Sequence, residues 1–500
     1  MRVFSKSKLL ALRQCPKRLW LEVHRPQLRA NSDAAERSFQ IGHSVGDIAH
    51  TIYDPQGNGE LIDVSKLGFA GAFERSKELL QKPQPVFEAG FSAGGALAFA
   101  DVMLPSVEGG AQSWRMIEVK SSTSVKNYHH DDVAVQAYVA KSAGVNLQAI
   151  ALAHIDSSWV YPGNQDYRGL LKENDLSAEA FARSTEVKEW IAQACGVVEQ
   201  IEEPTIAIGA HCDVPFECGF HIYCSRNEPK PEYPVYWLPR ISSARVQELA
   251  KEGVDDLRDI LDEHLNERQQ RVKTHTLAGT VYFDAVGAAK DLAPFSLPIQ
   301  FLDFETIQFP VPIWAGTRPY QQIPFQFSLH TLIADGSLQH REFLDLTGQD
   351  PSLYFAQALI AACGNQLWPI FAYNASFEKA RIFNLAERFP TLQDDLLSIN
   401  ERIQDLLPIA RERYYHPSQR GSWSIKAVLP ALVPDLRYSD LEGVQDGAMA
   451  MDAFLEAINP GTPGARKESI NSQLLAYCKL DTFAMVKLWQ VFSGRTELKL

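Results

Sequence analysis

Two acidic residues in the stretch "FLDFET" have the type and spacing of metal ligands. Asp303 and Glu305 are two positions apart in an apolar strand pattern, so their side chains lie on the same face of the strand. A carboxylate within an apolar run is costly unless a metal ion or another partner compensates its charge. Asp303 and Glu305 are therefore candidate metal ligands.

Three residues farther along the chain extend this candidate site. Glu378 lies in "FAYNASFEKARI", where a strand pattern turns into a helix. Tyr477 and Asp481 lie in the helical pattern "YCKLDTFAMVKLW", four positions apart and hence on one helix face. We expect these side chains to join the two acids of the strand.

A second set of candidates lies in the N-terminal half, on neighbouring strand patterns. Asp101 lies in "FADVM", and Glu118 and Lys120 point the same way in "IEVKSS". Asp101 and Glu118 offer oxygen ligands for Mg²⁺, and Lys120 can position a water molecule or stabilise charge on the phosphate. Glu88, one strand earlier, adds a carboxylate. By itself, the short "EVK" triplet is more commonly a solvated strand face with a salt bridge.

Three of the seven cysteines fall in "HCDVPFECGFHIYC", at Cys212, Cys218 and Cys224, with five residues between neighbours. In a reducing compartment, clustered cysteines indicate metal or redox chemistry before disulfides. Zinc could use these thiols with His211 or His221, although zinc sites usually contain more closely spaced cysteine pairs. Unliganded thiols are a third option. Three other cysteines lie in helical patterns, and we interpret them as packing residues: Cys195, Cys363 and Cys478.

The predicted elements divide the chain into two α/β modules joined by a small helical segment. Helical spacing in residues 1–50 precedes short apolar runs that suit a strand meander, and further helices follow up to the cysteines. After the proline-rich stretch "RNEPKPEYPVYWLPR", short helices lead to a second strand-rich start at "LPIQFLDFET". From Ala375 onward the pattern is mostly helical. We therefore predict three segments, residues 1–228, 229–294 and 295–500.

The bulk composition limits the class of protein only weakly. The 45% hydrophobic and 22% charged residues are typical of an ordinary globular protein. The net charge of −13 argues against a protein coated in nucleic acid, but nuclease sites are themselves built from carboxylates. No apolar run is long enough to span a bilayer, and the N-terminus lacks an apolar signal core. We therefore expect a cytoplasmic protein with no membrane association.

The N-terminal candidates follow one another along the chain in the order Glu88, Asp101, Glu118, Lys120, and then Gln136 and Tyr138 on a helix. This order resembles the PD-(D/E)XK nucleases, and within them the RecB and Cas4 branch. The resemblance implies a restriction-endonuclease-like fold in which Asp101, Glu118 and Lys120 form the catalytic core and the two acids bind metal. Glu88 and Gln136 would be accessory. The branch often has an early-helix histidine four residues after a glycine, where this chain has Gly46.

The same branch suggests a fourth ligand for the cysteine cluster. Cas4-type and AddB-type nucleases carry an iron–sulfur staple with one cysteine before the nuclease core and three after it. Cys15, in "LRQCPKRLWL", precedes the first strand patterns, and the three clustered cysteines follow the last helix. The resemblance implies that Cys15, Cys212, Cys218 and Cys224 bind a [4Fe–4S] cluster, with Zn²⁺ as the alternative.

The C-terminal motifs resemble the DEDD exonucleases of the DnaQ-like, ribonuclease H-like class, in its tyrosine subclass. This resemblance implies that four acids hold Mg²⁺ or Mn²⁺, that Tyr477 orients the attacking water, and that cleavage proceeds 3′→5′. The acids are Asp303, Glu305, Glu378 and Asp481. The usual residue of the second motif is Asp rather than Glu378, and Asp405 is a secondary candidate for the shorter carboxylate.

Nearly the whole chain is similar to bacterial RecB-like nucleases fused to a DnaQ-like C-terminus. This similarity implies a two-site, metal-dependent nuclease acting on DNA ends or single strands. No Walker A motif occurs, so unwinding would require a partner helicase or an opened substrate. As an alternative, one module is inactive and grips DNA for the other, as a scaffold in a DNA repair or defence complex. A third class is a structural protein of such a complex.

Overall fold

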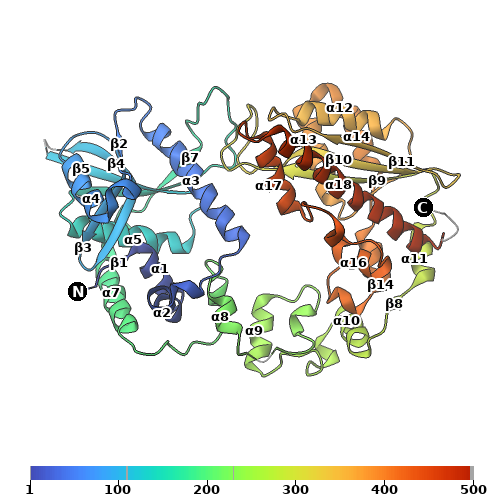
Figure 1. The fold of residues 1–500 in the computed structure, drawn as a ribbon, viewed down its shortest axis with the longest axis horizontal. Coiled ribbons are helices and arrows are strands. Elements are labelled where there is room, and N and C mark those ends of the chain that lie inside the picture. Colours follow the sequence, from blue (N-terminus) through green and yellow to red (C-terminus); the bar gives the residue numbers. More distant parts are fainter. Residues whose placement is uncertain (1, 109–110, 229, 496–500) are drawn as a thin grey trace. The chain divides into compact units, whose positions relative to one another are not determined.

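The computed structural model describes residues 2–108, 111–228 and 230–495. The chain forms two compact units with mixed sheets and covering helices, so the predicted α/β architecture is confirmed (Figure 1). The first unit comprises Met1–Pro229 and Phe309–Tyr320, and the second comprises Lys230–Gln308 and Gln321–Leu500. None of the helices in the described ranges is long and apolar enough to cross a membrane.

A seven-stranded sheet forms the centre of the first unit. Its parallel pairs are β2 with β3, β5 with β6 and β1 with β4, and the other pairs are antiparallel. The path of strands through the sheet is β2 (Glu60–Leu61), β3 (Val86–Ala93), β4 (Ala96–Glu108), β5 (Ala111–Lys120), β6 (Leu147–Ile155) and β7 (Leu171–Asp175), and β1 (Phe4–Ser5) pairs with β4.

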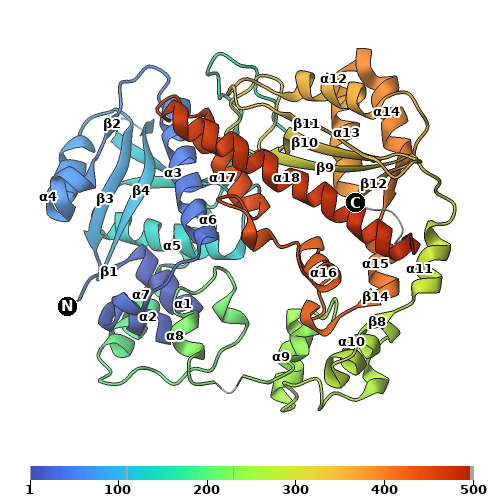
Figure 2. The same cartoon turned by 45° about the vertical axis from the view of Figure 1, so that its right-hand side comes forward.

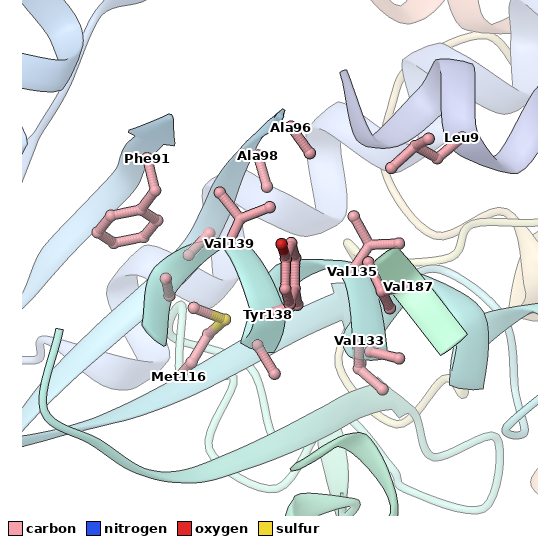
Figure 3. Close-up of a cluster of buried hydrophobic side chains, with 14 of the residues drawn as sticks. Leu9, Phe91, Ala96, Ala98, Met116, Val133, Val135, Tyr138, Val139 and Val187 are labelled. Atoms are coloured by element: carbon pink, nitrogen blue, oxygen red, sulfur yellow. The ribbon is translucent and has the colours of Figure 1, made fainter. Parts of the chain in front are cut away.

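The helix after the Glu118–Lys120 strand covers one face of this sheet. It is α5 (Asn127–Ser142), whose central residues are almost all apolar and buried, as expected for a core helix. Figure 3 shows Val135, Tyr138 and Val139 of this helix against Met116 of β5 and Ala98 of β4. The other helices of the unit are α1 (Lys6–Gln14), α2 (Pro16–His24), α3 (Asp33–Tyr53), α4 (Val64–Leu79), α6 (Ser177–Ala182), α7 (Ser184–Val198) and α8 (His221–Ser225).

The segment Phe309–Tyr320 belongs to the first unit, although it lies in the C-terminal part of the sequence. The backbone of Tyr161 exchanges two hydrogen bonds with it, from Tyr161 N to Thr317 O at 2.9 Å and from Gly316 N to Tyr161 O at 2.8 Å. The phenol of Tyr320 donates to the carbonyl of Ser121, next to Lys120. The predicted boundary at residue 295 therefore does not separate this segment from the first unit.

A five-stranded sheet forms the centre of the second unit, with helices on both faces (Figure 2). The strand order is β11 (Leu338–Leu344), β10 (Ile323–Leu332), β9 (Ile299–Ile307), β12 (Ile370–Ala372) and β13 (Ile403–Asp405). The strand β10 runs antiparallel to both of its neighbours, β11 and β9, whereas β9, β12 and β13 run parallel to one another. The strand that carries the two acids of "FLDFET" is thus the central one.

The helices of the second unit bury both faces of β9. Leu302 and Phe304 pack in one cluster with α12 (Ser352–Cys363), α13 (Ser376–Arg388) and α14 (Gln393–Arg402). Phe301, on the face of Asp303, packs in another cluster. The helices that contribute to this second cluster are α11 (Ala285–Leu292), α15 (Leu407–Arg413), α16 (Ile425–Leu432) and α18 (Gly464–Ser493), and α17 (Gly447–Ile458) contacts β9 and α18.

The predicted helical segment at 229–294 belongs to the second unit. Its helices α9 (Ser243–Lys251) and α10 (Glu267–Ala278) enclose a small apolar core, and β8 (Tyr282–Phe283) pairs with β14 (Tyr414–Tyr415). Gly421 permits a close approach, since a Cβ atom there would lie 1.6 Å from the carbonyl oxygen of Trp237. The backbone at Gly421 also has a φ of +76°, which favours glycine.

Candidate functional site

Three carboxylates of the second unit converge on one point. Ligand atoms of Asp303 and Glu305, from β9, and of Asp481, from α18, all lie within 4.8 Å of one another. Among the described residues, no other group of three histidine, cysteine or acidic residues is this close. We call these three residues the acidic triad.

The helix α18 is held against the sheet by polar contacts that fix its rotation. The side-chain amide of Gln326, on β10, donates to the carbonyl of Leu474 at 2.8 Å. The hydroxyl of Thr482, the residue after Asp481, lies 2.7 Å from the hydroxyl of Ser328. In the strand register, Ser328 lies opposite Asp303. These contacts hold Asp481 over the face of β9 that carries the other two acids.

The electrostatics of the acidic triad favour a cation. Burial, followed by repulsion from Asp481, raises the pKa of Glu305 to about 8. Burial is also the main cause that raises the pKa of Asp481 to about 6 and that of Asp303 well above its usual range. A divalent cation would offset this repulsion, and oxygen-only ligands fit Mg²⁺ or Mn²⁺. The residues present therefore fit the predicted metal.

The fourth predicted acid, Glu378, lies in the first turn of α13 and is buried. It is outside the 4.8 Å group, but its charge contributes to the raised pKa values of Asp303 and Glu305. Its Oε2 is buried and has no hydrogen-bond partner, and burial raises its own pKa to about 8. A buried carboxylate oxygen without a hydrogen-bond partner fits the chemistry of a further metal ligand.

The secondary candidate Asp405 lies at the end of β13. Its Oδ1 accepts hydrogen bonds from the backbone N–H groups of Asn374 at 3.0 Å and Leu407 at 2.9 Å. It therefore stabilises the backbone at the ends of β12 and β13. Its charge also contributes to the raised pKa of Glu378.

Two further residues of this site were not identified from the sequence. Tyr438, in a short turn, donates its phenol proton to Oδ1 of Asp481 at 2.5 Å. The amino group of Lys426 lies 5.2 Å from the ring centre of Tyr438 and 5.1 Å from that of Tyr477. Lys426 lowers the pKa of Glu305 and Asp481, against the larger effect of burial. No spacing rule connects either residue to the "YCKLD" motif.

Cys478, interpreted from the sequence as a packing residue, is buried beside the acidic triad. Its sulfur lies 3.8 Å from Oδ2 of Asp303. Burial and the neighbouring acids raise the pKa of the Cys478 thiol well above its usual range. The residue therefore presents a neutral thiol to the carboxylates.

The first unit brings Glu118 and Lys120 into a buried ionic network. The amino group of Lys120 lies 2.5 Å from both Glu118 Oε1 and Asp132 Oδ2. The amino group of Lys6, from α1, lies 2.8 Å from Glu118 Oε1 and from Asp132 Oδ1. The amide of Gln136 donates to Glu118 Oε2. We call Lys6, Glu118, Lys120 and Asp132 the ionic network.

Lys6 and Asp132 were not identified from the sequence. Asp132 precedes Gln136 by four positions on α5, so the two side chains share a helix face. This spacing could have identified Asp132 as a candidate from the sequence. Nothing local marks Lys6, which reaches the network because β1 pairs with β4 just before α1 begins.

The other predicted acids of the first unit surround this network. Oδ2 of Asp101 accepts a hydrogen bond from the backbone N–H of Val119 at 2.7 Å. Burial, followed by repulsion from Glu118, raises the pKa of Asp101 above its usual range and that of Glu88 to about 7. In the described ranges, Glu88, Asp101 and Glu118 do not come within 4.8 Å as a group.

The backbone at Glu88 is in a rare conformation, with a φ of 56° within β3. The strand changes faces there, since Phe87 packs with Ile117 and Ala89 packs in the cluster of α5. Such a residue costs about 1–3 kcal/mol, and strained residues of this kind are often found at functional sites. On α3, the ring of His50 lies 4.4 Å from that of Phe87, and His43 is exposed.

All four predicted cysteine ligands line one small cavity in the first unit, of about 20 Å³, together with His211 and His221. They are Cys15, Cys212, Cys218 and Cys224. The amide of Gln14, which precedes Cys15, donates to the carbonyls of His211 and Phe216, both at 2.7 Å. The structure thus brings together cysteines that lie nearly two hundred positions apart in the sequence.

The spacing of these thiols is wider than that of a closed single-metal site. In the described part of the chain, no three of them lie within 4.8 Å of one another. Tetrahedral zinc with Zn–S bonds of about 2.3 Å places its sulfurs about 3.8 Å apart. The thiolates of a four-iron cluster bind four different irons and therefore lie farther apart. The cavity therefore offers four thiols and two histidines as ligands, and among the described residues these thiols do not have the close spacing of a tetrahedral zinc site.

Comparison with known families gives one match. A family model described as a domain of unknown function (DUF2779) matches residues 300–424. This range includes Asp303, Glu305 and Glu378 and ends before Tyr438 and Asp481. A search of curated proteins found no match to the chain.

Proposed function

We propose that this protein is a metal-dependent nuclease that hydrolyses phosphodiester bonds in DNA, with the acidic triad as its catalytic centre. The observation that carries the proposal is the convergence of three carboxylates within 4.8 Å, two of them buried and that of Asp303 half-buried, beside the unsatisfied oxygen of Glu378. Buried acids of this kind are costly in a domain with only a structural role. In metal-dependent phosphoryl transfer, such acids bind the metal ions that assist the reaction.

In this proposal, the acidic triad and Glu378 hold Mg²⁺ or Mn²⁺, which activates water and stabilises charge on the phosphate. Tyr438 holds the carboxylate of Asp481 in one orientation through its hydrogen bond. Burial raises the pKa of Tyr477, so its phenol stays protonated and can orient the attacking water. Lys426 adds positive charge near the phosphate that is being cleaved. Cleavage in the 3′→5′ direction follows from the resemblance to DEDD exonucleases.

For the first unit, we propose a second nuclease centre formed by Asp101, Glu118 and Lys120. Metal binding there requires Glu118 Oε1 to exchange its two lysine partners for the ion. That occupied carboxylate favours the alternative, in which the first unit is an inactive scaffold that grips DNA. We further propose that the four cysteines hold a [4Fe–4S] cluster, with Zn²⁺ as the alternative. We also propose that the protein acts in the cytoplasm. Its substrates would be DNA ends or single strands opened by a helicase.

The test is a cleavage assay on end-labelled DNA and RNA with Mg²⁺ or Mn²⁺. Asp303→Ala is expected to abolish stepwise shortening from the 3′ end, and Lys120→Ala is expected to abolish a different product. If only Asp303→Ala changes the products, the first unit is the scaffold. If neither substitution changes cleavage, both catalytic centres are wrongly assigned. Faster cleavage of RNA than of DNA would overturn the substrate.

A further inference from the structure

Two adjoining cavities of about 470 and 480 Å³ open on the second unit, in addition to the acidic triad. They share Arg240 and Arg268 in their linings. Arg271 lines the first cavity, and Arg411 lines the second. We call these four arginines and the two cavities the arginine pocket. Its size is that of a ligand site.

The arginines reach the pocket from three different elements. Arg268 and Arg271 are three positions apart on α10 and therefore lie on neighbouring turns of one face. Arg411 belongs to α15, and Arg240 lies before α9 with a left-handed φ of 57°. Residues from the helical segment and from the sheet module are thus both needed to build the pocket.

Positive charge in the pocket is only partly neutralised. Glu412 pairs with Arg268 and lies 3.9 Å from a terminal nitrogen of Arg271. Within the described residues, neither Arg240 nor Arg411 is paired with an acid. The Nε of Arg268 is buried and has no hydrogen-bond partner. Four guanidinium groups therefore face two lining acids, Glu412 and Glu267, in a chain whose net charge is −13.

The other three arginines of the pocket repel the charge of Arg268. Burial lowers the pKa of Arg268, and the neighbouring charges of Arg411, Arg240 and Arg271 lower it further. A cluster of like charges that destabilises itself is expected to bind an anion. Guanidinium groups match phosphate best, since their forked donors bind two oxygens at once.

The second cavity of the arginine pocket lies beside the segment that leads to Glu378. Tyr373 and Asn374 line its second cavity, and Asn374 is four positions before Glu378. The N-terminus of α16 also lies in the lining, where Ser424 makes no side-chain capping bond. Backbone N–H groups of a helix N-terminus add to anion binding. The pocket therefore adjoins the segment that carries an acid of the catalytic centre.

We propose that the arginine pocket binds backbone phosphates of a single nucleic acid strand, without reading its sequence. The strand as ligand rests on the proposed nuclease function, whereas phosphate binding itself does not. Cavities of this size enclose a few phosphates of one strand, and backbone contacts position a strand but carry no sequence information. The competing explanation is that the arginines only tie α10 to α15 through Glu412.

The test uses the full-length protein in EDTA, so that binding is measured without cleavage. Arg240→Gln/Arg411→Gln removes the two unpaired arginines and leaves the pairs of Glu412 intact. The matched control is Arg245→Gln/Lys251→Gln, which removes the same charge from α9 outside the pocket. Fluorescence anisotropy with labelled oligothymidine is measured over a range of salt concentrations, with a duplex of equal length as a second probe. Melting temperatures check that both variants are folded.

The pocket variant is expected to lose at least about tenfold in affinity for the single strand and about 1.4 in the slope of log K against log salt. The control is expected to bind as the parent does. An equal loss in both variants, or none in the pocket variant, overturns the proposal. It is also overturned if the substitutions weaken only the binding of the duplex. Because cleavage plays no part here, failure of the nuclease proposal would show separately, with Asp303→Ala.

Discussion

The phenol of Tyr438 donates to Oδ1 of Asp481 over 2.5 Å, which links the turn Tyr438–Asp440 to the helix that carries Tyr477. The hydrogen bond favours the ionised form of Asp481 against the larger effect of burial. Burial, followed by the charge of Asp481, raises the pKa of Tyr438, so this residue remains a proton donor at all relevant pH values. Tyr438 is therefore a positioning residue for Asp481, which we propose as a metal ligand.

Tyr438→Phe is expected to lower the cleavage rate about tenfold at neutral pH, as is typical when a ligand loses its supporting hydrogen bond. The substitution removes the bond that stabilises ionised Asp481, so the pKa of Asp481 rises above about 6. Since ionised Asp481 holds the metal, the defect should be largest near pH 6 and smaller near pH 9. A pH–rate profile checks this. Tyr236→Phe, at an exposed tyrosine, is the control, and a defect independent of pH would contradict the role.

The raised pKa values of the acidic residues predict how metal-free stability depends on pH. Glu305 and Glu378 have folded pKa values of about 8, above the 4.5 of an ordinary glutamate. The folded protein therefore holds more protons than the unfolded chain between these values, and the free energy of unfolding falls as the pH rises through that window. The melting temperature without metal should be lower at pH 8 than at pH 5.

Metal should reverse this dependence, because it binds the ionised carboxylates of the folded protein. Mn²⁺ is expected to raise the melting temperature more at pH 8 than at pH 5. Calorimetry with and without Mn²⁺ measures both effects. The variant Asp303→Asn/Glu305→Gln should have a flatter pH profile and a smaller response to Mn²⁺. An identical response in this variant would place the metal elsewhere.

Lys6→Met is expected to destabilise the first unit by about 3 kcal/mol, since it leaves two buried carboxylates with one lysine partner. Urea denaturation measures the loss. Lys8→Met is the control, because Lys8 lies on the same helix and has no part in the ionic network. If the first unit is a nuclease, Mg²⁺ should restore part of the lost stability, because the released Glu118 can then bind the ion. No effect of Mg²⁺ would favour the scaffold.

Cys15→Ser tests the long-range cysteine site. Protein purified without oxygen is expected to be brown and to contain iron, and this substitution should remove both the colour and the iron. Cys195→Ser is the control, because Cys195 packs beside the core of the first unit, away from the cavity. A colourless parent protein with one equivalent of zinc would assign the cavity to zinc instead.

The acidic triad could be predicted because local periodicity carries it. A spacing of two on a strand and of four on a helix each place side chains on one face. Apolar packing of α18 against the face of β9 that carries Phe301 then brings the two sets of acids together. Tyr438, Lys426 and Lys6 could not be predicted in this way. Each reaches its site through tertiary contacts of an element with no spacing relationship to the motif.

The segment Phe309–Tyr320 was missed for a related reason. Its residues, "FPVPIWAGTRPY", are rich in apolar side chains, but no local pattern states which core these side chains join. In the structure, Val311 and Tyr320 pack with Val45, Ile155 and Leu170 of the first unit. Only the long-range packing, which is absent from any short window of sequence, decides this assignment.

The return of the chain to the first unit at Phe309–Tyr320 affects how the protein can be divided into fragments. The polypeptide passes from one unit to the other near residue 229, returns at 308–309 and leaves again at 320–321. Neither unit is therefore a single continuous stretch of chain, and a protease cut near residue 229 would leave the units joined by two covalent connections. A fragment that stops at residue 294 would lack Tyr320 and Val311 and expose the apolar surface that they cover. Failure of such a fragment to stay in solution would thus say nothing about the stability of the first unit in the intact chain.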